Sequence, residues 1–63
     1  MWRADMKLKV AHEMFEGLQT VYQTYYSDHK SDVEVQVRDF LADLKNQNYV
    51  VVVSEITYEQ LKG

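Results

Sequence analysis

The sequence predicts a small α+β domain with the element order β-α-α-β. We expect two helices on one face of an antiparallel strand pair, with a second copy completing the sheet. Three observations support this prediction: strict apolar–charged alternation over residues 2–10, apolar residues at three- and four-residue spacing over 11–44, and a run of β-formers over 49–53. With 63 residues, the chain is long enough for one domain, residues 1–63.

The first element is expected to be a strand over residues 2–10. Its apolar positions alternate with charged ones without exception, which is the period of a half-buried strand. The expected buried face consists of Trp2, Ala4, Met6, Leu8 and Val10. Ala, Met, Leu and Lys favour helices, however, and only Val10 in this segment is β-branched. A helix therefore remains the alternative for this segment.

The second element is expected to be an amphipathic helix of about four turns. Its apolar stripe has helical spacing and consists of Ala11, Met14, Phe15, Leu18, Val21, Tyr22, Tyr25 and Tyr26. Gly17 lies inside this segment and weakens a helix by about 1 kcal/mol relative to Ala. Gly17 is either a tolerated weak position or a notch where another backbone approaches closely.

A second helix is expected after a turn at residues 27–30. Ser31 caps it, because Glu34 three residues later completes a capping-box pattern. The apolar stripe is Val33, Val37, Phe40, Leu41 and Leu44. Val35 falls off that stripe, so the rival interpretation makes 33–37 a short alternating strand followed by a shorter helix. The polar residues 46–48 end the helix.

The last element is expected to be a strand that starts with Tyr49–Val53 and continues to Tyr58. Alternation places Val50, Val52, Ile56 and Tyr58 on one face and Tyr49, Val51 and Val53 on the other. Such a strand is usually covered on both faces, and its best partner in the chain is residues 2–10. In an alternative interpretation, Thr57 caps a final helical turn.

Dimerisation is expected because stability is marginal at this size. Burial and conformational entropy nearly cancel in a domain of 63 residues, and no disulfide is possible without cysteine. Pairing or stacking two copies across a two-fold axis would cover the apolar strand. The expected interface residues are aromatic or belong to the apolar strand: Trp2, Tyr22, Tyr25, Tyr26, Tyr49, Val51 and Val53.

No catalytic, cofactor-binding or metal-binding residues are expected, and no small-molecule substrate is implied. His12, Glu13 and Glu16 lack the His-Glu-x-x-His pattern of zinc proteases, and a solvated helix face explains them better. The residues Asp28, His29 and Asp32 are explained by turn and helix-start chemistry. The sequence therefore favours a protein that is not an enzyme and uses no cofactor.

Seven Lys and Arg against ten Asp and Glu argue against nucleic-acid binding. The longest apolar run, 49–53, is too short for a membrane span, and no signal peptide is visible, so a cytoplasmic protein is expected. The preferred hypothesis is a homodimeric module that binds another protein as a regulator or inhibitor. The alternative is a dimeric DNA-binding regulator that places the row Arg3, Asp5, Lys7 and Lys9 in a major groove.

Overall fold

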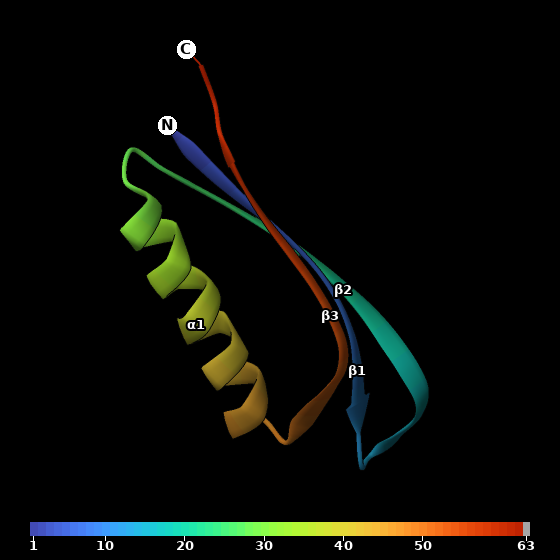
Figure 1. Ribbon diagram of the computed structural model, residues 1–63. Coiled ribbons are helices and arrows are strands. Elements are labelled where there is room, and N and C mark those ends of the chain that lie inside the picture. The colour runs from blue at the N-terminus through green and yellow to red at the C-terminus, as the bar shows by residue number, and fades with distance from the viewer. Residues whose placement is uncertain (63) are drawn as a thin grey trace.

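Three strands and one helix make up residues 1–62, the part of the chain that the computed structural model describes. Their order is β1 (Trp2–His12), β2 (Phe15–Ser27), α1 (Lys30–Asn46) and β3 (Tyr49–Gln60). The strands form one antiparallel sheet in the order β2-β1-β3, and α1 lies along one face of it (Figure 1). The predicted β-α-α-β domain with two helices is therefore wrong.

The central strand β1 confirms the predicted strand at residues 2–10. Its alternation buries one side completely or nearly so, through Ala4, Met6, Leu8 and Val10. The charged residues between them face away from α1, as strand geometry requires. Alternation thus overrides the helix propensity of this segment, because a helix would scatter these four apolar residues around its circumference.

The segment predicted to be the first helix instead forms the end of β1, a tight turn and the strand β2. Six of the seven residues in 20–26 are β-branched or aromatic, and these residue types fit a pleated surface better than a helix. The helical spacing of the apolar residues is coincidental. On the strand, Val21 and Tyr25 face α1 and pack against the core, whereas Tyr22 and Tyr26 face the other way.

The ring of His12 ties the β1–β2 turn to the turn between α1 and β3. The backbone N–H of Met14 donates to Nδ1 of His12 at 3.0 Å. Because Nδ1 accepts, the proton of the neutral ring is on Nε2, which lies 3.0 Å from the carbonyl oxygen of Gln47 and donates to it. The same ring packs against Tyr49, with centroids 4.7 Å apart.

Gly17 enables a bulge in β2 rather than a close contact. Between the pairs Val10–Gln19 and His12–Phe15, β1 contributes one residue and β2 contributes three. Gly17 absorbs the extra length with a left-handed backbone, at φ 80°, and an added Cβ would meet nothing within 4 Å. The left-handed conformation, and not an approaching backbone, explains the glycine.

Gly17→Ala is therefore expected to lower the free energy of unfolding by about 1 kcal/mol, because a Cβ disfavours positive φ. Gly17→Asn is the control, since Asn tolerates this conformation better and should lose less. Urea unfolding followed by circular dichroism measures both variants. An alanine variant as stable as the unmodified protein would contradict the bulge assignment.

The single helix predicted over Val33 to Leu44 is confirmed as α1, and the strand alternative for 33–37 is wrong. Val33, Val37 and Leu44 are buried against the sheet, and Val35 is exposed. The predicted cap is wrong: the helix starts at Lys30, so Ser31 lies within its first turn and His29 occupies the N-cap position.

Asn48 adopts a left-handed backbone, at φ 68°, and lets the chain reverse into β3. The strand β3 confirms the predicted last strand and its antiparallel pairing with residues 2–10. It continues to Gln60, so the alternative turn capped by Thr57 is wrong.

The predicted faces of β3 are also wrong, because Val52 is an extra residue in the register: Lys9 pairs with Val53 and Val10 pairs with Val51. This bulge places Tyr49, Val51, Ile56 and Tyr58 on the helix side. Val50 and Val53 face away from the helix.

Candidate protein-interaction surface

The face of the sheet opposite α1 is uncovered by any other part of residues 1–62 (Figure 1). We call this surface the open face. Its members come from the register positions that alternate with the buried ones: Arg3, Asp5, Lys7, Lys9, Thr20, Tyr22, Thr24, Tyr26, Val50, Val53, Glu55, Thr57 and Glu59. The cations lie on the central strand, the tyrosines on β2 and two acids on β3. The cations, tyrosines and acids of β3 therefore lie in separate rows on the open face.

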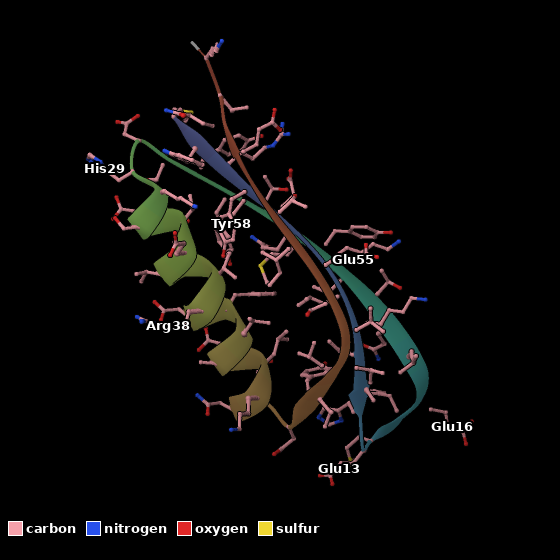
Figure 2. All side chains as sticks on the ribbon, viewed as in Figure 1. Glu13, Glu16, His29, Arg38, Glu55 and Tyr58 are labelled. Atoms are coloured by element: carbon pink, nitrogen blue, oxygen red, sulfur yellow. The ribbon has the colours of Figure 1, made fainter. Side chains whose placement is uncertain are left out.

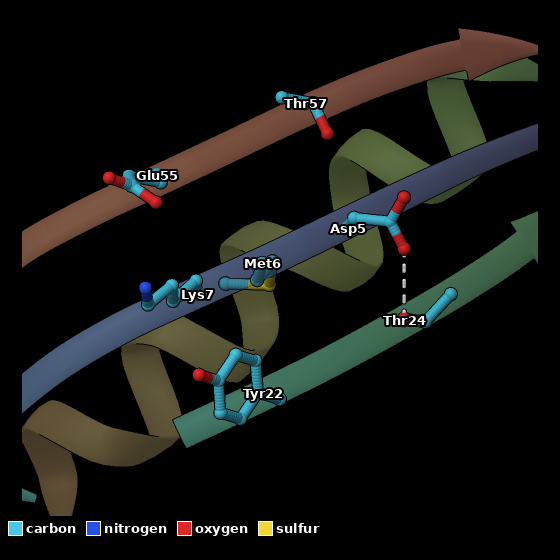
Figure 3. Close-up of a pocket in the computed structure, with 7 residues that line it drawn as sticks. All are labelled: Asp5, Met6, Lys7, Tyr22, Thr24, Glu55 and Thr57. Atoms are coloured by element: carbon cyan, nitrogen blue, oxygen red, sulfur yellow. Dashed lines mark hydrogen bonds between the residues drawn. The ribbon is translucent and has the colours of Figure 1, made fainter. Parts of the chain in front are cut away.

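At one end of the open face, Arg3 is held between two carboxylates. Its Nε lies 2.9 Å from Oδ2 of Asp5, and its Nη2 contacts the carboxylate of Glu59. These two acids, Asp5 first, raise the pKa of Arg3 above its usual value. Thr24 donates its hydroxyl to Oδ1 of Asp5 at 2.9 Å (Figure 3). This end of the face is thus pre-organised by its own ion pairs.

A shallow hollow of about 210 Å³ lies in the middle of the open face. Figure 3 shows the side chains around it; the lining residues are Asp5, Met6, Lys7, Tyr22, Thr24, Glu55 and Thr57. Lys7 stands between its register partners Tyr22 on β2 and Glu55 on β3. Small-molecule sites usually start at about 300 Å³, so this hollow suits one side chain of a protein partner better than a substrate.

The two tyrosines are the largest apolar groups of the open face. Tyr22 is 69% exposed and Tyr26 is 55% exposed. Tyrosine combines a large rigid apolar body with a hydroxyl that hydrogen-bonds, and it is enriched at the centres of protein interfaces. Tyr22 and Tyr26 lie next to the cations Lys7 and Arg3 of β1, so the open face offers a partner both apolar contact area and polar groups.

The predicted interface residues lie on two different sides of the sheet. Tyr22, Tyr26 and Val53 belong to the open face. The other four lie on the helix side and pack against the core: Trp2, Tyr25, Tyr49 and Val51. The ring of Trp2 lies beneath the Lys30 ammonium, whose nitrogen is 5.3 Å from the ring centroid.

Sequence reasoning missed the acids of the open face, Glu55 and Glu59, and their relation to the cations of β1. The register of β1 and β3 pairs Lys7 with Glu55 and Arg3 with Glu59. The alternation of side-chain faces along residues 54–60 was the available signal. It assigns Glu55 and Glu59 to a particular face of the sheet only when the position of the bulge at Val52 is known.

Tyr25 has a different environment from its exposed neighbours. It packs edge-on against Phe40 of α1, with centroids 6.4 Å apart. Burial first, and the charge of Asp43 second, raise the pKa of Tyr25 above its usual value of 10.0. The folded protein therefore favours the neutral phenol at this position.

Alkaline pH is expected to destabilise the protein through Tyr25. A raised pKa in the folded state contributes stability that is complete below about pH 10 and is lost as the pH rises through the folded pKa. Urea unfolding at a series of alkaline pH values measures this loss. Tyr25→Phe should reduce the pH dependence, whereas Tyr22→Phe, at an exposed position of β2, should leave it in place. Equal slopes for the two variants would contradict the assignment.

The polar cluster around Glu13 and the one around His29 lie at opposite ends of the molecule (Figure 2). Glu13 and Glu16 lie at the hairpin end of the sheet, and His29 lies at the opposite end of the molecule (Figure 2). Ser27 donates its hydroxyl to Oδ2 of Asp32 at 3.0 Å, so this acid stabilises the turn before α1. Among residues 1–62, no three His, Cys, Asp or Glu side chains are grouped as a metal site requires.

No protein-family model matches the chain, and comparisons with curated proteins and with solved structures find no match either. Within residues 1–62, no helix combines the length and apolar character that a membrane crossing requires.

Proposed function

We propose that this protein is a small non-enzymatic interaction module that acts as a homodimer and binds another protein through its open face, as a regulator or inhibitor. The observation that carries the proposal is the uncovered sheet face, on which the exposed Tyr22 and Tyr26 lie beside Lys7 and the ion-paired Arg3. A cytoplasmic location is part of the proposal and rests on the sequence.

The charge balance of the open face supports a protein partner. Each of its cations at Arg3 and Lys7 faces an acid across the β1–β3 register, and Asp5 lies between them. A protein surface with mixed charges complements such a pattern, whereas a phosphate backbone needs cations without acids beside them. The alternative, a dimeric DNA-binding regulator, receives less support for this reason.

The surface area of the chain supports the homodimer. It is 4706 Å², whereas a compact monomer of 7.5 kDa has about 4,250 Å². The excess follows from the elongated shape, 43 × 17 × 11 Å, and from an open face without a second layer. A contact between two copies would remove part of the exposed surface of each copy from water.

Sedimentation equilibrium at micromolar concentration tests the homodimer, with an expected mass of twice 7.5 kDa. A stable monomer over that range would refute this part of the proposal.

The partner-binding part is tested by capture from the native host lysate with the unmodified protein and with Tyr22→Ser/Tyr26→Ser. We expect a protein that the unmodified chain retains and the double variant loses. Val35→Ser, an exposed change on α1, is the matched control and should retain it. If all three chains captured the same proteins, the assignment of partner binding to the open face would be contradicted. Affinity for duplex DNA at low salt would favour the DNA-binding alternative.

A further inference from the structure

We propose that residues 49–54 at the start of β3 form the homodimer contact, by pairing antiparallel with the same residues of a second copy. This inference rests on the proposed homodimer and names its interface. The result would be a continuous six-stranded sheet with both helices on one face and a doubled open face on the other.

The exposed edge of β3 is the first argument. Within residues 1–62, β3 pairs with β1 on one side and with nothing on the other. Residues 49–54 contain no charge, and three of their four valines are exposed: Val50 by 64%, Val52 by 54% and Val53 by 44%. Proteins normally protect such an edge with Lys, Pro or an inward-pointing charge. This segment has none of these. A bulge can also protect an edge and is present at Val52, but the backbone and three valines of the segment remain exposed and favour a partner strand.

The other edge of the sheet is less suited to strand addition. In β2, the left-handed backbone at Gly17 and the extra residues around it interrupt the regular ladder. Such a bulge twists an edge away from a flat partner strand. The strand β3 also has a bulge, but its bulge is a single extra residue, Val52, without a left-handed backbone, whereas β2 has two extra residues and Gly17 at φ 80°. The two edges therefore differ, and β3 is the one that favours pairing.

An apolar groove beside the same segment is the second argument. It has a volume of about 420 Å³ and lies between α1 and β3; its lining residues are Leu41, Lys45, Tyr49, Val50, Val51 and Ser54. A strand that joins the edge of a sheet next to a helix places alternate side chains into such a groove. The side chains at the start of the second copy's β3 would fill it.

The side-chain faces of β3 are consistent with one register of this pairing. Directly opposite residues of antiparallel strands face the same side. Tyr49 and Ser54 both lie on the helix side, and Val50 and Val53 both lie on the open face. Pairing Tyr49 with Ser54 of the second copy, and Val50 with Val53, therefore keeps these four side chains on their own sides. The same register places Val51 opposite Val52, the extra residue of the bulge. Glu55 then lies outside the paired segment and meets no acid.

The first test compares a lysine at each edge of the sheet. Val52→Lys brings two like charges together at the proposed dyad and should weaken the dimer at least about 100-fold in sedimentation equilibrium. Leu18→Lys is the matched control, because it changes an exposed apolar residue of β2, and its dimer should keep its dissociation constant. Circular dichroism confirms that each variant is folded.

The second test uses disulfide formation, which the absence of cysteine in the chain makes unambiguous. Opposite positions in an antiparallel pair lie within disulfide distance. A mixture of Val50→Cys and Val53→Cys should therefore form the mixed disulfide faster than either chain forms a disulfide with itself. A mixture of Leu18→Cys and Val53→Cys should not, and this test does not depend on the folding of the lysine variant.

The outcomes separate the inference from the proposed function. A monomeric unmodified protein would overturn both. A dimer that survives Val52→Lys, dissociates with Leu18→Lys or forms no mixed disulfide between positions 50 and 53 would overturn the β3 contact and leave the homodimer standing. A dimer that is lost only with Val52→Lys, together with rapid mixed disulfide formation, is the result we expect.

Discussion

Leu8→Ala is expected to lower the free energy of unfolding by about 3–4 kcal/mol. Leu8 is completely buried at the centre of β1, where it lies between Val21 of β2 and Ser54 of β3 and belongs to the core beneath α1. Its truncation loses buried apolar area and leaves a cavity that a sheet with two fixed neighbours relaxes poorly. Because small domains have only about 5 kcal/mol of stability, this variant should retain only about 1–2 kcal/mol and unfold at much lower urea concentration.

Urea unfolding followed by circular dichroism measures this effect, at a fixed protein concentration because the proposed dimerisation would add to the apparent stability. Leu18→Ala makes the same chemical change at an exposed position of β2 and should cost less than about 0.5 kcal/mol. If the two variants were equally stable, Leu8 would not be in the core and the register of the sheet would be wrong.

The second large effect is expected at Val33→Ala, with a loss of about 2 kcal/mol. Val33 lies in the first turns of α1, is completely buried, and contacts the core formed by β1. The expected cost is smaller than for Leu8, since fewer atoms are removed.

Val35→Ala provides the matched control two residues away. Val35 is exposed on the outer side of α1, and alanine has the higher helix propensity, so this variant should be as stable as the unmodified protein or more stable by about 0.5 kcal/mol. Equal losses at the two positions would indicate that residues 33–37 alternate as a strand and would contradict the helix.

The strands β1 and β3 and the helix α1 were predictable because each has a local pattern that favours one element. In β1, charge and apolarity alternate from Trp2 to Val10, and β3 opens with five consecutive β-formers. In α1, the spacing of Val33, Val37 and Leu44 is helical. The antiparallel pairing of β1 with β3 followed from the lack of another good partner in the chain.

The second strand was not predictable from apolar spacing, because residues 11–26 satisfy a helical pattern by coincidence. The better signal was residue type: Thr20, Val21, Tyr22, Thr24, Tyr25 and Tyr26 all favour a strand. Gly17, read as a weakness in a helix, was another signal, because its left-handed backbone serves a bulge. Apolar spacing predicts a helix for this segment and residue type predicts a strand; the pairing with β1 agrees with residue type.

The predicted interface was divided for a related reason. A single extra residue, Val52, reverses the sides that the residues after it occupy, so Tyr49 and Val53 face opposite ways. Strand periodicity does not indicate where such an extra residue lies, because the position of the bulge depends on the register of β3 with β1. The same shift brings Glu55 and Glu59 to the open face beside Lys7 and Arg3.

The sequence by itself determined the strands β1 and β3, the helix α1 and the buried side of the central strand. These features depend on local periodicity, which each segment contains in full. Only the tertiary structure decided that residues 15–27 form a strand, which face remains uncovered, and which charges meet there. These features depend on the pairing of segments distant in the chain, and a one-residue change of register moves every following side chain to the opposite face.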